Sequence, residues 1–324
     1  MTNSCVVAAF LPIWNYMANS KKIDLTATCD WARKYVTPYK IEDPMKKVLV
    51  LGATGMLGHE VVSVLSKNHD VIATHRKALT PSLGVMCYRF DAEKVFGESL
   101  TNENDYYRRF VDDVGDVDYV VNCIGVTIPF AAKNPALTMF VNGVLPHILA
   151  ATYKEKLIHI TTDCVYSGTD GRAPYDERSE KSAFSLYGLS KSAGEPPSCL
   201  TIRTSIIGRE LDSHNGLLEW FLDAAKSGSA NGYTDHLWNG ITTHQYALIC
   251  DKIISAGFYP QGLYHVFSNA VTKYQMLQAF KERFHLKCDI VPVSGKPLDR
   301  RLGTVKHFND WLRVPSFQEM VQHL

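Results

Sequence analysis

Tyr187 and Lys191 are separated by three residues in the stretch Tyr-Gly-Leu-Ser-Lys, residues 187–191. On a helix this spacing places both side chains on one face. A phenol has a pKa of about 10 in water, so it transfers protons poorly at neutral pH unless its surroundings tune it. An ammonium within a few ångströms favours the phenolate and brings that pKa toward the working range. The pair therefore predicts a tyrosine proton-transfer site that Lys191 activates.

Thr162 adds a hydroxyl group to this pair. It follows an apolar segment, residues 157–161, that we predict to be a buried strand. Ligands of open parallel sheets bind at the carboxyl ends of the strands, so Thr162 is placed to hydrogen-bond a substrate carbonyl oxygen together with Tyr187. A lone Y-x-x-x-K pattern occurs by chance in many proteins. The strand end that precedes it makes Thr162, Tyr187 and Lys191 the candidate catalytic residues.

A glycine-rich turn, residues 52–58, reads G-x-x-G-x-x-G between an apolar strand-like segment and a segment with helical spacing. The first glycine permits a tight turn, the second lets backbone N–H groups approach a pyrophosphate, and the third lets the helix pack closely on the strand. The helix N-terminus adds about half a positive charge facing the phosphates. The turn predicts a dinucleotide site that involves Gly52, Thr54, Gly55, Met56, Leu57 and Gly58.

The end of the second predicted strand bears on the choice of dinucleotide. An NAD-preferring site typically has Asp or Glu there to hold the ribose 2′-hydroxyl. This chain has Thr-His-Arg-Lys at 74–77, with no acid. Arg76 can accept a 2′-phosphate, so NADP(H) is favoured and NAD(H) stays open; the alternative is that Arg76 and Lys77 face solvent. Asp91 ends the third predicted strand, where a carboxylate can reach the adenine amino group.

Strand-like and helical segments alternate from residue 45 onward, which is typical of a parallel sheet with crossover helices. The predicted strands are 48–51, 71–74, 86–90, 119–123, 157–161, 199–204 and 263–267, with a long helix from about 135 to 154. The fold class is therefore α/β, a Rossmann-like doubly wound parallel sheet with a smaller C-terminal substrate-binding domain. We predict an N-terminal extension of unclear role at 1–44 and an NAD(P)-binding domain at 45–208. Residues 209–324 are expected to be mainly substrate-binding, with a strand that returns to the sheet near 262–267.

The composition of the 324 residues is that of an ordinary globular protein, with 46% hydrophobic and 21% charged residues. A formal net charge of +1 provides no electrostatic footprint for nucleic acid or an anionic membrane. The apolar stretch from Cys5 to Met17 is too short and too interrupted to span a bilayer. None of the eight cysteines forms a C-x-x-C pair, so we expect no metal or disulfide use and a reducing, cytoplasmic location.

The motifs together resemble the extended short-chain dehydrogenases, and among them most of all the dTDP-4-dehydrorhamnose reductases and related nucleotide-sugar 4-ketoreductases. The resemblance spans about residue 46 to at least 305 and leaves residues 1–44 outside. The segments that carry it follow one another in the family's order: the glycine turn at 52–58, Val-Asn-Cys at 121–123, Thr-Asp-Cys-Val-Tyr at 162–166, Pro-Tyr at 174–175, Tyr187 to Lys191, and Arg-Thr at 203–204.

The resemblance implies reduction of a 4-keto nucleotide sugar by NAD(P)H, in the synthesis of deoxysugar or polysaccharide precursors. Thr162, Tyr187 and Lys191 would be catalytic, and the glycine turn would bind the pyrophosphate. Cys123, Ile124 and Gly125 would line the adenine–ribose side, with Asp91 near the adenine. Thr162 and Asp163 would touch the sugar. Asn142 resembles the family asparagine that supports the active site, and we group it with the substrate-binding residues; simple helix packing is the alternative.

Two departures from the family leave details open. The family commonly has an aromatic residue soon after the Arg-Thr pair, whereas here Ser-Ile-Ile follows at 205–207, which allows a sugar other than a plain 6-deoxyhexose. Some members also use Mg²⁺ at a dimer interface; those carboxylates have no counterpart that can be assigned here, so no metal is predicted. A homodimer is one expectation for the assembly.

Other functions remain open at this point. A nucleotide-sugar epimerase is possible on the same scaffold, whereas a dehydratase needs an acidic pair where this chain has only Asp163. A third alternative is a non-catalytic NADP-binding subunit that resembles the regulatory beta subunit of methionine adenosyltransferase. The loop at 239–243 and the Arg300-Arg301 pair are each as compatible with phosphate binding as with an ordinary structural or solvated role.

Overall fold

The computed structural model describes residues 45–76, 83–101, 105–211 and 214–324. The N-terminal extension at 1–44 and Lys77, on which the sequence carried expectations, lie outside these described residues.

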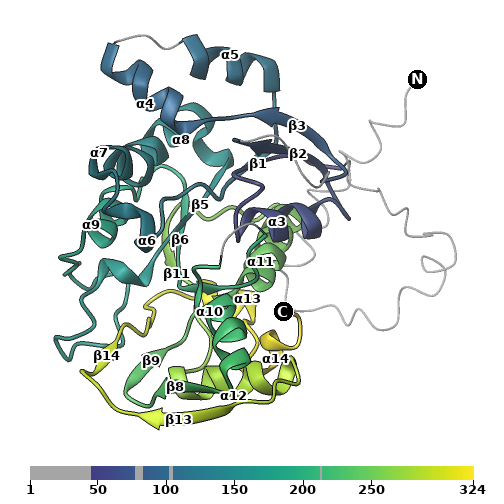
Figure 1. Ribbon diagram of the computed structural model, residues 1–324. Coiled ribbons are helices and arrows are strands. Elements are labelled where there is room, and N and C mark those ends of the chain that lie inside the picture. Colours follow the sequence, from purple (N-terminus) through teal and green to yellow (C-terminus); the bar gives the residue numbers. More distant parts are fainter. Residues whose placement is uncertain (1–44, 77–82, 102–104, 212–213) are drawn as a thin grey trace, which may run out of the picture. The chain divides into compact units, whose positions relative to one another are not determined.

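A seven-stranded sheet forms the centre of the fold, and all of its strand pairs are parallel (Figure 1). Its spatial order is β11-β6-β5-β4-β1-β2-β3. The strands are β1 (Lys47–Leu51), β2 (Asp70–His75), β3 (Met86–Arg89), β4 (Tyr119–Asn122), β5 (Leu157–Thr161), β6 (Leu200–Arg203) and β11 (Gly262–His265). The strand order reverses between β1 and β4, and this switch point is where open α/β sheets place their ligands.

Strand β1 illustrates why these segments form a sheet covered on both faces. Its residues from Val48 to Leu51 are completely buried. Val48 and Val50 belong to the hydrophobic core on one face of the sheet, whereas Leu49 and Leu51 belong to the core on the other face. A strand that is apolar at every position needs cover on both sides, as in doubly wound folds.

Helices supply that cover on the two faces. In Figure 1, α3 and α11 lie on one side of the sheet, and α4, α5 and α8 lie on the other. The helices are α3 (Gly58–Leu65), α4 (Ala92–Thr101), α5 (Asp105–Val114), α6 (Ile128–Ala131), α7 (Pro135–Met139), α8 (Leu145–Tyr153), α9 (Leu186–Ala193), α10 (Leu217–Ala224), α11 (Thr243–Ala256), α12 (Lys273–Arg283), α13 (Phe308–Leu312) and α14 (Phe317–Val321).

Helices α7 and α8 are joined by a π-helical turn, Phe140–Val144, into one long helical stretch. Residues 135–156 are long and apolar enough to cross a membrane, but 56% of the best window is buried inside the molecule. Leu145 and Leu149 of this stretch are completely buried in the core against the sheet. This packing accounts for its apolar character without a membrane.

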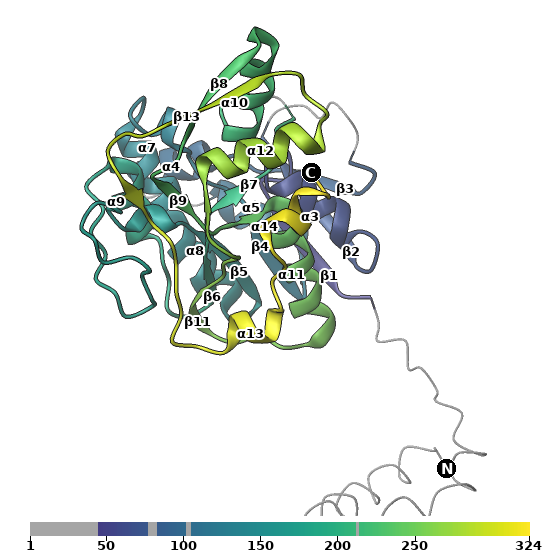
Figure 2. The same cartoon turned by 90° about the horizontal axis from the view of Figure 1, so that it is seen from below.

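The C-terminal third adds three small sheets beside the large one. The pair β8 (Ser229–Tyr233) and β13 (Asp289–Val293) is parallel and lies along α12, as Figure 2 shows. The other strands are β7 (Ile206–Ile207) with β10 (Ile241–Thr242), and β9 (His236–Trp238) between β12 (Val271–Thr272) and β14 (Leu298–Asp299).

The seven strands expected from the sequence are all present in the central sheet, so the predicted fold class is confirmed. Residues Met45–Leu324 form one compact unit by their contacts. The returning strand is β11, which pairs with β6 at one edge of the sheet. The division into a domain before residue 208 and another after it stays a prediction.

Candidate active site

Three adjoining hollows open at the carboxyl ends of the strands. The central cleft has a volume of about 630 Å³ and is lined by residues from the glycine loop, from the ends of β4 and β5, and from α9. The β2-side hollow, about 250 Å³, shares Gly55 and Cys123 with the cleft and extends to Thr54 and Asp91. The α12-side recess, about 390 Å³, shares Met56 and Tyr187 with it and extends to Trp238 and Lys273.

The glycine loop turns tightly at the mouth of the cleft. Gly52 has φ +79°, a conformation that L side chains rarely adopt, and its N–H donates to Thr74 Oγ1 at 2.9 Å. A Cβ on Gly58 would stand 2.1 Å from the Gly52 oxygen, so this residue lets α3 pack against the turn. A Cβ on Gly55 would meet only the Gly52 oxygen, at 3.4 Å, and would otherwise project into open space. The loop therefore leaves room for a ligand above Gly55.

The remaining predicted cofactor residues surround this loop. Arg76 is exposed and lines both the central cleft and the β2-side hollow. Asp91 lines the hollow and accepts a hydrogen bond from the N–H of Glu93 at 3.1 Å. The segment Cys123 to Gly125 lines both spaces, and a Cβ on Gly125 would come within 4.0 Å of Lys191 Nζ. Gly58 is buried and lies beneath the lining.

Thr162 caps a short 3₁₀ turn, Asp163–Val165, at the end of β5. Its Oγ1 accepts a hydrogen bond from the N–H of Cys164 at 3.1 Å and donates to Asp163 Oδ1 at 3.1 Å. Burial raises the pKa of Asp163, while Arg300, Thr162 and Lys273 act in the opposite direction. The Thr162 hydroxyl and the Asp163 carboxyl are therefore hydrogen-bonded to each other, and both residues line the central cleft.

Tyr187 lies in the first turn of α9, which Ser185 caps by accepting the N–H of Gly188 at 3.1 Å. A Cβ on Gly188 would stand 2.4 Å from the oxygen of Cys164, so a glycine here allows α9 to approach the turn after β5. This close approach brings Tyr187 to Thr162. Burial raises the pKa of Tyr187, and a hydrogen bond with Thr162 offsets only part of the effect.

This direction differs from the sequence expectation that Lys191 lowers the pKa of Tyr187. The Lys191 ammonium donates to the backbone oxygen of Ile160 at 2.9 Å, and burial of the phenol outweighs the other influences on Tyr187. The phenol is therefore protonated at neutral pH, which is the form that donates a proton.

Lys191 is 6% exposed, and burial lowers its pKa to about 8. Its ammonium has three hydrogens, of which one is directed to Ile160. Since Lys191 lines the central cleft, the other two remain for a ligand in the cleft.

Asn142 sits in the π-helical turn and is 1% exposed. Its Oδ1 accepts the N–H of Val126 at 2.8 Å, and its Nδ2 donates to the Val126 oxygen at 2.9 Å and to Ser190 Oγ at 3.1 Å. The amide is thus fully engaged beneath the cleft and does not line it. This position fits support of the loop after β4 and of α9.

Several lining residues were not recognised in the sequence. Phe130 and Lys133 line the central cleft, with the Lys133 ammonium 4.7 Å from the Phe130 ring centroid. Trp238 and Lys273 line the α12-side recess. No local motif marks these four residues. The fold brings them to the central cleft or to the α12-side recess only through tertiary packing.

The two features left open in the C-terminal third have structural partners. Asn239 makes a reciprocal pair with Leu302, as its Nδ2 donates to the Leu302 oxygen at 2.8 Å and its Oδ1 accepts the Leu302 N–H at 3.0 Å. Arg301 forms a two-pronged ion pair with Asp299. Arg300 donates from Nε to the Tyr166 oxygen at 2.9 Å and faces Asp163. Both features thus have structural partners, and phosphate binding by either of them stays a prediction.

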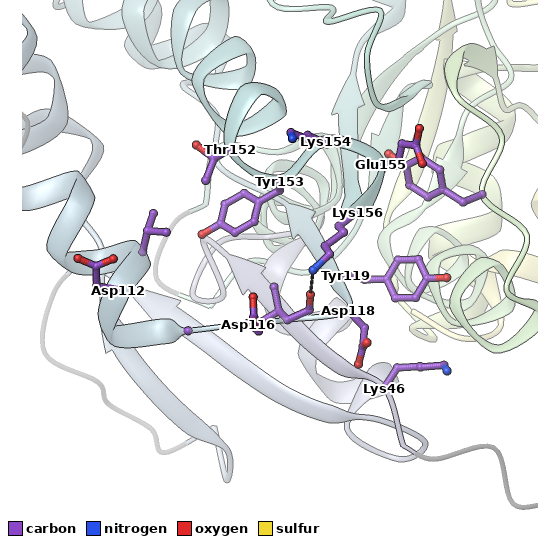
Figure 3. A pocket seen from close by; sticks show the side chains of 14 residues that line it. Lys46, Asp112, Asp116, Asp118, Tyr119, Thr152, Tyr153, Lys154, Glu155 and Lys156 are labelled. Atoms are coloured by element: carbon purple, nitrogen blue, oxygen red, sulfur yellow. Dashed lines mark hydrogen bonds between the residues drawn. The ribbon is translucent and has the colours of Figure 1, made fainter.

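A larger, open hollow of about 1070 Å³ lies at the opposite edge of the sheet (Figure 3). It is lined at the amino ends of β1, β4 and β5 by side chains of both signs, including Asp116, Asp118 and Lys156. The Lys156 ammonium donates to the Val117 oxygen at 2.7 Å. Because ligands of such sheets bind at the carboxyl ends, size alone does not make this hollow the active site.

Within the described ranges, no cluster of three or more His, Cys, Asp or Glu side chains could hold a metal ion. The six cysteines of these ranges, Cys87, Cys123, Cys164, Cys199, Cys250 and Cys288, are all free thiols.

The chain is similar in sequence to a known family and to several named proteins. A family model described as RmlD substrate binding domain matches residues 45–302. A protein named dTDP-4-dehydrorhamnose reductase from Mycolicibacterium smegmatis is 28% identical over 72% of this chain and 68% of its own length. A protein named methionine adenosyltransferase 2 subunit beta from Danio rerio is 24% identical over 80% of both chains.

Solved structures share the fold. The crystal structure of dTDP-4-dehydrorhamnose reductase from Bacillus anthracis in complex with NADP covers 86% of this chain and 98% of that one, with a TM-score of 0.66 and 19% identity. A Bordetella bronchiseptica enzyme crystallised with NAD⁺ reaches the same TM-score with 17% identity.

Proposed function

The chain belongs to the RmlD substrate binding domain family, and we propose that it is an NADP(H)-dependent oxidoreductase that reduces the 4-keto group of a nucleotide sugar. The observation that carries this proposal is that one cleft brings Tyr187, Lys191 and Thr162 together with the glycine loop. The relatives named dTDP-4-dehydrorhamnose reductase make a dTDP-linked keto sugar the first substrate to test.

The residues present fit a dinucleotide. The tight turn at Gly52 and the open space above Gly55 leave a cradle for the pyrophosphate at the amino end of α3. Arg76 lies at the end of β2, where a 2′-phosphate needs a cation, and no carboxylate ends that strand. When bound, NADPH supplies a hydride to the carbonyl carbon.

The chain's own residues position the ketone and supply the proton. When the ketone binds, Thr162 redirects its single hydroxyl hydrogen from Asp163 Oδ1 to the carbonyl oxygen and so orients it. The protonated phenol of Tyr187 gives its proton to that oxygen as the alcohol forms. Lys191 stays fixed on the Ile160 oxygen and uses its two remaining N–H groups to hold ribose hydroxyls. Correct placement of these groups before reaction is the main contribution of the protein to catalysis.

The test is steady-state oxidation of NADPH by the full-length protein with a panel of 4-keto nucleotide sugars, beginning with the dTDP-linked 4-keto-6-deoxyhexose. We expect turnover with NADPH and slower turnover with NADH. Absence of turnover with every 4-keto nucleotide sugar would overturn the proposal.

A second candidate function is a regulatory subunit that binds NADP(H) without turnover. It is favoured by the match to methionine adenosyltransferase 2 subunit beta, which spans more of this chain than the match to the Mycolicibacterium smegmatis reductase. The complete set of Thr162, Tyr187 and Lys191 argues for the reductase instead. Tight NADP(H) binding without reduction of any keto sugar would favour the regulatory subunit. Epimerization on the same scaffold would instead show as product formation without net oxidation of NADPH.

A reducing compartment such as the cytoplasm suits this activity, and the free thiols of the described cysteines are compatible with it. The proposed partner is the nucleotide-sugar substrate, with no role for nucleic acid or a membrane.

A further inference from the structure

Lys273 occupies a helix position that does not suit a cation. It is the first residue of α12, whose N-cap Thr272 forms a complete capping box with Gln275. The amino end of a helix carries partial positive charge, so a cation there is unfavourable, and Lys281 and Arg283 occupy the end where cations stabilise. Helix stability therefore does not explain Lys273.

The side chain of Lys273 is half-buried and lines the α12-side recess. It lines this recess together with Tyr187, Ser205 and Met276, and its ammonium lies 5.7 Å from the ring centroid of Trp238. Burial lowers the pKa of Lys273 to about 8, with Asp163 and Cys164 acting in the opposite direction and Arg300 in the same one. Within the part of the chain that the structure describes, no carboxylate oxygen lies within 4.0 Å of this ammonium.

The nearest opposite charge, Asp163, already has other partners. It accepts the hydroxyl of Thr162 at 3.1 Å, and Arg300 favours its ionised form more strongly than Lys273 does. Two cations, Arg300 and Lys273, thus face one carboxylate. Arg300 does not line the recess and is held by the Tyr166 oxygen, whereas Lys273 does line it. Lys273 is half-buried. A cation partly withdrawn from water without a bonded partner is costly, and an anionic ligand would reduce that cost.

The rest of the recess offers little else to an anion. Its other charged residue is Glu210, whose Oε2 accepts the N–H of Asn215 at 3.1 Å. The remaining lining is mainly apolar or hydroxyl-bearing, with Met56, Ile206, Trp238 and Met276 among the apolar residues and Tyr187 and Ser205 among the hydroxyl-bearing ones. Lys273, next to the amino end of α12, is therefore the anion-binding group of this recess.

We propose that Lys273 binds the phosphate that joins the sugar to the nucleotide in the substrate. This inference rests on the proposed function, since it takes the keto carbon of the sugar to lie at Tyr187. Tyr187 and Lys273 both line the recess, so a sugar held at the tyrosine can extend its substituents toward the lysine. A sugar ring is neutral, and the diphosphate is the part of a nucleotide sugar whose charge matches this half-buried ammonium.

Binding of dTDP, dTMP and thymidine by full-length wild-type, Lys273→Met, Lys273→Arg and Lys281→Met proteins, measured by isothermal titration calorimetry with NADP⁺ present, tests this inference. Lys281→Met is the matched control, because it removes the same charge from the other end of the same helix. Loss of a charged hydrogen bond weakens binding by about tenfold to a hundredfold. We expect that loss for dTDP with Lys273→Met, little change for thymidine, and near wild-type affinity with Lys273→Arg and Lys281→Met.

The pH dependence provides a readout that a purely structural lysine would not change. Wild-type affinity for dTDP should fall as pH rises through the lowered pKa of Lys273, whereas Lys273→Arg should keep its affinity over the same range. Asp163, Cys164 and Arg300 are the charged and titratable groups that act on the pKa of Lys273. They are the same in both proteins, so a difference between the two pH profiles comes from residue 273.

The outcomes separate this inference from the proposed function. If the wild type reduces a nucleotide sugar and Lys273→Met binds dTDP as tightly as the wild type does, the role of Lys273 is wrong and the function stands. If the wild type neither binds dTDP nor reduces any nucleotide sugar, both are wrong. Thermal unfolding of Lys273→Arg confirms that the fold persists when the charge is kept.

Discussion

The hydroxyl of Thr162 donates a hydrogen bond to the neighbouring carboxylate of Asp163, with 3.1 Å between Oγ1 and Oδ1. The same oxygen accepts the N–H of Cys164, and its interaction with the phenol of Tyr187 lowers the pKa of that phenol. Thr162 thus interacts with the turn after β5, with the carboxylate of Asp163 and with the proton-donating phenol of Tyr187.

Replacing Thr162 by Val should lower kcat by about 10²-fold, the usual cost of losing one positioned donor at a developing oxyanion. Thr162→Ser keeps the hydroxyl and should remain within a few-fold of wild type. Steady-state kinetics with NADPH and the keto sugar measures both. Equal loss in the two variants would show that shape, not the hydroxyl, is what the site needs at this position.

Two glycines of the loop should respond differently to an added methyl group. A Cβ at Gly58 would lie 2.1 Å from the Gly52 oxygen, so Gly58→Ala should destabilise the fold by about 1–3 kcal/mol or more. At Gly55 the Cβ would touch only the Gly52 oxygen, at 3.4 Å, and would project toward the ligand. Gly55→Ala should therefore unfold like wild type while NADPH affinity drops at least about tenfold.

Thermal unfolding and fluorescence titration with NADPH distinguish the two glycine variants. Gly97→Ala, where a Cβ meets open space on α4, is the control for the added methyl group itself. Wild-type NADPH affinity in Gly55→Ala would contradict the assignment of the loop as the pyrophosphate site.

Arg76 should determine the preference for NADPH over NADH. A charged hydrogen bond to a phosphate contributes about 1.5–3 kcal/mol, so Arg76→Ser should reduce the ratio of kcat/KM for NADPH to that for NADH by about tenfold to a hundredfold. Arg76 is exposed, so the unfolding free energy should not change. Arg89→Ser, an exposed arginine at the end of β3 outside the hollows, serves as control. An unchanged ratio in Arg76→Ser would show that this arginine faces solvent and does not bind the 2′-phosphate.

The lowered pKa of Lys191 makes stability depend on pH. Its pKa is about 8 in the folded protein against 10.5 as the ordinary value. Between these values the unfolded chain binds the proton and the folded protein does not, so the unfolding free energy rises with pH; below pH 8 the buried ammonium reduces stability. Lys191→Met should therefore be more stable than wild type below pH 8, by on the order of 3 kcal/mol.

That stability gain should shrink from pH 8 upward and disappear near pH 10.5, while activity is lost at every pH. Urea unfolding at several pH values measures it, with the exposed Lys67→Met, in the turn after α3, as control. A gain that stays constant across the range would mean that packing, not charge burial, separates the two proteins.

The parts of this site that lie next to strand ends were predictable from the sequence. Gly52, Thr162 and the Tyr187–Lys191 pair follow or adjoin apolar runs whose length and composition identify buried strands and a helix, and parallel strands gather such ends at one edge. Other parts had no local signal. Lys273 and Trp238 reach the cleft through packing of β9 and α12, elements separated along the chain by more than thirty residues, as their numbering shows.

The sequence predicted which residues form the site better than it predicted their burial, pKa values and hydrogen bonds. The spacing of Tyr187 and Lys191 predicts an ammonium beside a phenol, but it does not reveal how deeply the phenol is buried or that the ammonium is directed to Ile160. Likewise, Asn142 resembles a substrate contact in sequence, whereas its π-helical turn directs the amide into hydrogen bonds with Val126 and Ser190.

The central claim is that Tyr187 protonates the carbonyl oxygen as the ketone is reduced. Tyr187→Phe removes only the hydroxyl, and its single-turnover rate of NADPH oxidation with the keto sugar tests this claim most directly. We predict a fall of about 10²- to 10⁴-fold, the usual contribution of a positioned acid, with NADPH affinity within a few-fold of wild type. Hydride transfer at the wild-type rate in Tyr187→Phe would contradict the mechanism.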